Sequence, residues 1–123
     1  MADKRIQTFE AFWPYYVGEH RDPTCRVLHY IGSSCALVFL ALTILVSPWF
    51  LLAGVVSGYA FAWIGHFFVE KNKPATFTYP LWSLAADWKM YGLFITGKMA
   101  AEVTRLYGSA APSADAPLRS HAG

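Results

Sequence analysis

The sequence predicts an all-α membrane protein built around a two-span transmembrane helical hairpin, and three observations lead to this prediction. Hydrophobic residues make up 55% of the 123 residues and charged residues only 15%, against roughly 25% charged in typical soluble domains. Residues 27–69 hold no Asp, Glu, Lys or Arg over 43 positions, and one span needs about 20 apolar residues. Ser47-Pro48-Trp49 divides this stretch, since proline fits the first turn of a helix but not its interior.

The first predicted element is an amphipathic helix over about residues 4–18, lying at the membrane interface. Its apolar and aromatic side chains recur at helical spacing, although Pro14 disturbs the pattern. These side chains are Phe9, Phe12, Trp13, Tyr16 and Val17.

The hairpin itself is predicted as helices over about 23–46 and 48–72. Asp22 is a strong N-cap, and the following Pro23 suits the first helical turn. Ser47 can cap the second helix and Pro48 can begin it, while the proline just beyond residue 72 ends it.

Basic residues set the expected orientation of the hairpin. They lie before and after it but not at its Ser47-Pro48-Trp49 turn; they include Lys4, Arg5, Arg21, Arg26, Lys71, Lys73, Lys89, Lys98 and Arg105. Basic residues stay cytoplasmic. We therefore expect an integral membrane protein with both termini cytoplasmic, in the inner membrane if it is bacterial. The net charge of +2 is too small to indicate a nucleic-acid partner.

Small residues predict close contact between the two spans. Gly54 and Gly58 form a GxxxG pattern, and Gly32 and Ala36 form a similar one. GxxxG could equally serve self-association, which would give a homo-oligomer.

Residues 80–107 are predicted as one further helix, lying along the interface or packed against the hairpin. A third span over 77–97 is the alternative, but it would bury Asp87 and Lys89 at a cost of several kcal/mol. The helices together form a single membrane domain, 1–107. Residues 108–123 are rich in Ser, Ala and Pro, which predicts a disordered tail.

Two histidines are expected at the same depth. His29 lies 19 residues before Pro48 and His66 lies 18 after it, so each sits roughly 27–29 Å from the turn at about 1.5 Å per residue. Glu70 shares a helix face with His66, one turn further out. His20 lies in the loop before the first span and can fold over the same place.

Three imidazoles and one carboxylate make a candidate metal site, with His20, His29, His66 and Glu70 as ligands. Two histidines and a carboxylate suit non-haem Fe(II), which keeps positions open for O2 and substrate. Zinc would accept the same set. Each residue alone is more often an ordinary interfacial side chain, and only the coincidence of depth, face and chemistry favours a site.

Asp87 has two interpretations from the sequence. An acid within an apolar segment is a functional candidate, for example a partner that orients a ligand histidine. It could equally pair with Lys89 or Arg26 at the interface. His121, in the tail, receives no role.

Two motif blocks resemble a known family. His20, Pro23 and His29 form H-x-x-P-x5-H, and the residues from Gly65 form G-H-x3-E-K-x2-P-A. Over roughly residues 8–100 the chain resembles the small membrane family that includes the fungal 2-hydroxy fatty acid dioxygenase of the endoplasmic reticulum. It is shorter than the fungal pattern and lacks further hydrophobic segments between the blocks. Its substrate cavity could therefore differ from that of the fungal members.

The resemblance implies iron-dependent alpha-oxidation, in which a 2-hydroxy fatty acid reacts with O2, loses CO2 and becomes one carbon shorter. It implies Fe(2+) as cofactor and His20, His29, His66 and, by position, Glu70 as site residues. Arg21 or Arg26 could hold the substrate carboxylate by a charge-assisted hydrogen bond. Two other functions remain open: a haem protein with His29 and His66 as axial ligands, and a non-catalytic membrane scaffold or lipid-binding protein.

Overall fold

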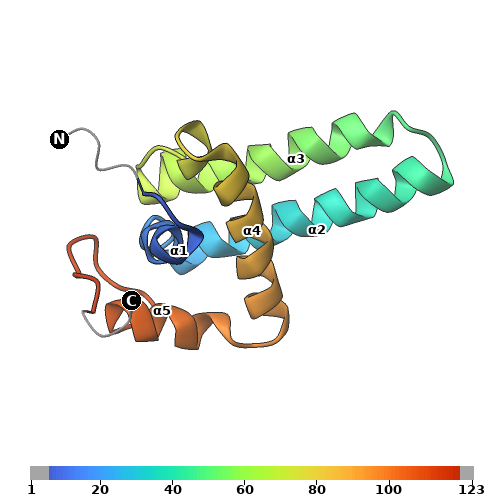
Figure 1. Ribbon diagram of the computed structural model, residues 1–123. Coiled ribbons are helices and arrows are strands. Elements are labelled where there is room, and N and C mark those ends of the chain that lie inside the picture. The colour runs from blue at the N-terminus through green and yellow to red at the C-terminus, as the bar shows by residue number, and fades with distance from the viewer. Residues whose placement is uncertain (1–5, 120–123) are drawn as a thin grey trace.

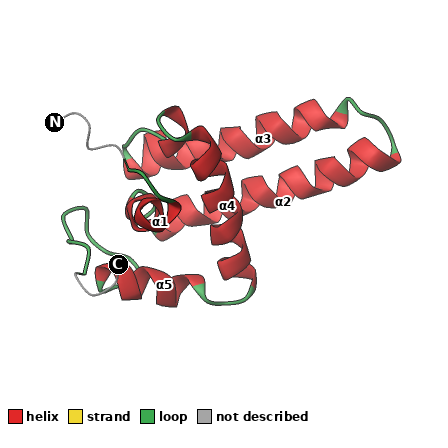
Figure 2. Ribbon diagram, viewed as in Figure 1, coloured by secondary structure: helices red, strands yellow, loops and turns green. Residues whose placement is uncertain are grey.

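The computed structural model describes residues 6–119, and the regular elements within this range are all helices (Figure 2). They comprise five α-helices, a π-helical turn that continues the third, and a short 3-10 turn. In chain order they are α1 (Phe9–Gly18), α2 (Pro23–Leu45), α3 (Phe50–Ile64), η1 (Gly65–Glu70), η2 (Ala75–Phe77), α4 (Pro80–Ile95) and α5 (Met99–Tyr107). The predicted all-α fold is confirmed.

Two antiparallel helical stretches form the predicted hairpin (Figure 1). Pro23–Leu45 and Phe50–Glu70 are each long and apolar enough to cross a membrane. Their outer surface exposes large apolar side chains, for example Val38 at 59% and Leu52 at 60%. Exposed apolar surface of this kind marks a site that lipid or another protein covers, and it supports the predicted membrane association. We call the turn between the helices the tip and the opposite end the base.

The helix ends differ in part from those predicted. Asp22 caps α2 as expected, accepting a hydrogen bond from Thr24 N at 2.8 Å. α3 begins at Phe50 rather than at 48, because residues 47–52 form three-residue turns such as Phe50 N to Ser47 O at 3.2 Å. The helical stretch ends at Glu70 rather than at 72, where the left-handed Lys71 (φ 60°) reverses the chain.

The small residues of the two spans face each other within the same chain. A Cβ added to Gly32 would lie 3.0 Å from Gly58 O and 3.2 Å from Phe61 Cβ. A Cβ added to Gly54 would lie 3.1 Å from Phe39 Cβ. The GxxxG residues therefore serve the hairpin contact, which is the first of the two roles that the sequence allowed.

The remaining helices gather at the base, where they build the core. α1 is amphipathic as predicted and packs its apolar face into this core: Phe12, Tyr16 and Val17 are fully buried, while Glu10 and Ala11 are exposed. Thr8 caps it at Phe9, so residues 6–8 are not helical, while residues 4 and 5 of the expected helix lie outside the described range. The core comprises Phe12, Trp13, Tyr16, Val17, Tyr30, Ala75, Ala86, Met90, Met99, Val103, Leu106 and Tyr107.

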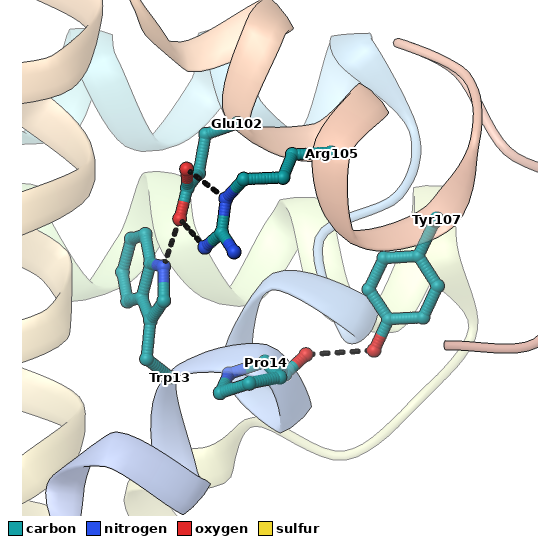
Figure 3. Close-up of polar contacts among 5 residues, drawn as sticks. All are labelled: Trp13, Pro14, Glu102, Arg105 and Tyr107. Atoms are coloured by element: carbon teal, nitrogen blue, oxygen red, sulfur yellow. Dashed lines mark hydrogen bonds and ion pairs between the residues drawn. The ribbon is translucent and has the colours of Figure 1, made fainter. Parts of the chain in front are cut away.

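α5 fastens α1 in place (Figure 3). Trp13 Nε1 donates a hydrogen bond to the Glu102 carboxylate at 2.7 Å. Arg105, one turn further along α5, forms an ion pair with the same carboxylate. Tyr107 donates its hydroxyl to the Pro14 carbonyl at 2.7 Å. α1 is thus held rigidly just before the loop that carries the first site histidine.

The expected single helix over 80–107 is two helices. Gly97 takes a left-handed conformation (φ 75°) between α4 and α5, which an α-helix cannot accommodate. α4 crosses the hairpin near its base (Figure 1). Its 16 residues span roughly 24 Å, and it is not among the helices long and apolar enough to cross a membrane in the described range. The packed position, rather than a third span, is the one found.

Candidate metal centre

Three imidazoles from different elements converge at the base of the hairpin. His20 comes from the loop between α1 and α2, His29 from the second turn of α2 and His66 from η1. Their ring centroids lie 4.4 Å apart for His20 with each of the others, and 5.0 Å apart for His29 with His66. All three are buried, at 1–6% exposure. The predicted meeting of the two span histidines with the loop histidine is therefore found.

The outer ring nitrogen of each imidazole lies against a carbonyl oxygen. The three pairs are His20 Nδ1 with Tyr16 O at 2.7 Å, His29 Nδ1 with Cys25 O at 2.9 Å and His66 Nδ1 with Asn72 Oδ1 at 2.8 Å. A carbonyl only accepts, so we assign the proton of each neutral ring to Nδ1. Each Nε2 then presents a lone pair to the others, as a metal ligand does.

The close approach of His20 to His29 favours a bound cation at this place. Their Nε2 atoms lie 3.1 Å apart, and two lone pairs at this distance repel unless a cation lies between them. Burial, and after it the neighbouring imidazoles, hold the pKa of His20 well below its ordinary value. A proton is therefore a poor candidate for that cation, and a metal ion is a good one.

Asn72 orients His66, a role that no pattern in the sequence predicts. Its side-chain oxygen faces His66 while its Nδ2 donates to Glu19 O at 3.1 Å, which fixes the orientation of the amide. Asn72 lies six residues after His66, where no regular helix spacing would bring the two together. The left-handed Lys71 turns the chain back, so that Asn72 N also donates to His66 O at 2.9 Å.

Tyr16, which is buried, and Asp87, which is half-buried, form a hydrogen-bonded pair beside the cluster. The Tyr16 ring stacks on the His20 ring with centroids 4.1 Å apart, and its hydroxyl donates to Asp87 Oδ1. Burial, and next the Asp87 charge, raise the pKa of Tyr16 well above its ordinary value. Burial raises the pKa of Asp87 to about 7, against the opposing effect of the Tyr16 hydrogen bond. Within residues 6–119 Asp87 forms its hydrogen bond with Tyr16 and no ion pair with Lys89 or Arg26; the Lys89 Nζ lies over the Trp13 ring.

Glu70 is not placed with the three histidines. The cluster of mutually close ligand atoms in the described residues comprises His20, His29 and His66. One oxygen of Glu70 accepts a hydrogen bond from Asp22 N at 2.6 Å. The first amides of a helix lack partners within it, so a carboxylate one turn beyond His66 meets the start of α2 before it can reach the cluster.

Arg21 and Arg26 hold backbone carbonyls. Arg26 is buried and donates to His20 O at 2.7 Å and to Ala110 O at 2.6 Å. Arg21 donates to Ser113 O at 2.7 Å. Arg26 therefore fixes the loop that carries His20. Both arginines bind residues 110–113, the start of the segment expected to be a disordered tail; residues 120–123, which include His121, lie outside the described range.

An apolar groove leads from the cluster between the two spans. Its volume is about 440 Å³, and it runs from His29 and Asp87 at the base to Leu40 and Leu51 towards the tip. From His29 to Leu40 the groove follows α2 for roughly 16 Å at 1.5 Å per residue. A much smaller cavity, lined by His29, His66 and Asp87 among others, adjoins it. The groove can take an apolar chain whose polar end reaches the histidines.

The donor set fits a small metal ion. The three ligand atoms lie within 4.8 Å of one another, and three neutral imidazoles on one side of an ion leave positions open for substrate, as in catalytic zinc or non-haem iron sites. Haem fits poorly, because the planar porphyrin would have to separate His29 and His66. Their ring centroids are only 5.0 Å apart, and His20 contacts both.

The comparisons with known proteins identify the family of the chain. A family model described as 2-hydroxy-palmitic acid dioxygenase Mpo1-like matches residues 6–99, a range that contains all three histidines. The comparisons with curated proteins and with solved structures found no match. The resemblance inferred from the two motif blocks is thereby confirmed, and the chain belongs to the 2-hydroxy-palmitic acid dioxygenase Mpo1-like family.

Proposed function

We propose that this protein is an integral membrane dioxygenase that uses non-haem iron to shorten 2-hydroxy fatty acids by one carbon. The 2-hydroxy acid and O2 give the fatty acid one carbon shorter, CO2 and water. The four electrons that O2 takes up come from the two carbons that are oxidised, so the reaction needs no external reductant. His20, His29 and His66 would hold the iron, and Glu70 is left out of the ligand set.

The observation that carries the proposal is the orientation of the three imidazoles. Each Nδ1 faces a carbonyl oxygen, so each Nε2 is available to a cation. Bound iron supplies O2 activation and a Lewis acid for the hydroxyl and carboxylate of the substrate. The protein contributes the fixed imidazoles and a buried site that excludes bulk water.

The groove supports a long acyl chain as the substrate. Its length of roughly 16 Å is about half of the ~30 Å hydrocarbon core of a bilayer. An acyl chain in the groove would therefore reach from the polar boundary to the middle of the membrane, as the chains of lipids do. The exposed side chains along it, such as Leu37 and Val55, leave it open to surrounding lipid.

Metal analysis of anaerobically purified protein tests the proposal. We expect near-stoichiometric iron in the wild type, and oxygen uptake with CO2 release on addition of 2-hydroxypalmitate. The His66→Ala variant should lose most of the iron and the turnover, because one of three ligands is missing. His121→Ala, which changes the one histidine outside the cluster, is the matched control and should keep both.

A wild type without bound metal would contradict the proposal, as would turnover that survives His66→Ala. Retained membrane insertion and lipid binding in a metal-free wild type would favour the non-catalytic scaffold instead.

A further inference from the structure

Asp87 lies where the site and the groove meet. α4 crosses the hairpin at its base (Figure 1), which brings this carboxyl to the end of the groove nearest the histidines. Asp87 also lines the small cavity that His29 and His66 line. It is thus the acidic residue that a ligand would meet when its chain lies in the groove and its polar end lies at the cluster.

The two oxygens of this carboxyl have different surroundings. Oδ1 accepts the hydroxyl hydrogen bond of Tyr16, whose ring is fixed by stacking on His20. In the described part of the chain Tyr16 is the hydrogen-bond partner shown for Asp87, and no buried side-chain oxygen lacks a partner. Oδ2 is therefore not fully buried, and Asp87 lines both the groove and the small cavity beside it.

We propose that Asp87 recognises the 2-hydroxyl group of the substrate, with Oδ2 accepting its hydrogen bond and Tyr16 positioning the carboxyl. This inference rests on the proposed function, since it assumes that a 2-hydroxy fatty acid occupies the groove. The 2-hydroxyl is on the carbon next to the substrate carboxylate. When that carboxylate lies at the histidines, the hydroxyl lies beside the adjoining wall of the small cavity. Asp87 is the carboxylate on that wall, and the Thr76 and Ser83 hydroxyls that also line the cavity are hydrogen-bonded to each other at 3.0 Å.

Selectivity for 2-hydroxy acids follows because an unsubstituted fatty acid would leave an oxygen of the Asp87 carboxyl without a hydrogen bond. Its second carbon bears only hydrogen, so its chain would cover the carboxyl oxygen without offering a hydrogen bond. A site built to bind a substrate hydroxyl rejects the analogue that lacks it, because the polar group of the site is left without a partner. Asp87 would accordingly set the preference for 2-hydroxylated over plain acids rather than the affinity for the chain.

Anaerobic equilibrium binding to the iron-loaded protein in detergent tests this role without turnover. The probes are 2-hydroxypalmitate, 3-hydroxypalmitate and palmitate. We expect the wild type to bind the 2-hydroxy acid at least tenfold more tightly than the other two. In Asp87→Asn, which keeps the volume but replaces the open oxygen with a donor, this ratio should fall about tenfold. The Kd for palmitate should change less than threefold, and iron content should not change.

Two further variants separate recognition from general effects. Tyr16→Phe should reduce the ratio partially, because the carboxyl loses its positioning bond but remains in place. Glu10→Gln removes an exposed acid of α1 and should leave the ratio unchanged.

The inference would be overturned by a wild type that binds all three acids equally or by an Asp87→Asn variant that keeps the full ratio. Loss of iron from Asp87→Asn would also overturn it, since the residue would then act through the metal. Failure of the proposed function is a separate result: it would show as a wild type without iron or without CO2 release, whatever its binding ratio.

Discussion

At the residue scale, the outer partners of the imidazoles decide how well the site is arranged. His20 and His29 each donate to a backbone carbonyl four residues earlier, which a helical turn supplies by itself. His66 instead depends on a side chain, that of Asn72. A backbone carbonyl cannot be mutated, so Asn72 is the one member of this outer set that is open to direct test.

We expect Asn72→Ala to lower iron affinity about 10- to 100-fold, because a ligand histidine that loses its outer acceptor loses both orientation and basicity. Competition with a chelator would measure the change. Lys73→Ala, an exposed neighbour, should leave the affinity unaltered. Equal affinities for wild type and Asn72→Ala would show that the imidazole holds its position without the amide.

At the element scale, the contact between α2 and α3 depends on which glycine receives a side chain. Ala at position 32 would press its Cβ against Gly58 O at 3.0 Å and Phe61 Cβ at 3.2 Å. Ala at position 58 would meet nothing closer than 3.8 Å. We therefore expect Gly32→Ala to destabilise the hairpin by about 1–3 kcal/mol, the usual cost of overpacking, and Gly58→Ala to be near neutral.

Unfolding in mixed detergent micelles, followed by circular dichroism, would compare the two variants. If both lowered stability by the same amount, the close approach of the helices at Gly32 would be refuted.

The packing of the elements also explains why the predictions for Glu70 and for the single helix over 80–107 differ from what is found. Spacing placed Glu70 on the face of His66, but the free amide at Asp22 lies nearer to its carboxylate. The residue types over 80–107 favour a helix throughout. The break between α4 and α5 depends on one residue, the left-handed Gly97. Glycine can adopt that conformation or a helical one, so the local sequence alone does not select between them.

At the scale of the whole molecule, charge and packing divide the protein into two ends. The core and the histidine cluster lie at the base, together with basic residues such as Arg21, Arg26 and Lys71. The tip carries none and exposes Trp49, a residue that suits a membrane interface. The proposal that both ends of the chain face the cytoplasm follows from this division.

Reporter fusions in a bacterial host test that orientation. Green fluorescent protein joined after residue 123 should fluoresce, and alkaline phosphatase joined there should be inactive, because the former folds in the cytoplasm and the latter outside it. Phosphatase joined at residue 48 should be active. The reverse pattern at both sites would mean that the metal cluster faces away from the cytoplasm.

The sequence by itself determined the hairpin, its proline turn and the common depth of His29 and His66. These depend on hydrophobicity and helical rise, which act locally along the chain. Only the tertiary structure decided which groups meet across elements: Asn72 with His66, Tyr16 with Asp87, and Glu70 with the start of α2 rather than with the cluster. Such contacts depend on how the helices pack and, for Asn72, on the left-handed Lys71. A periodic pattern in a sequence does not predict them.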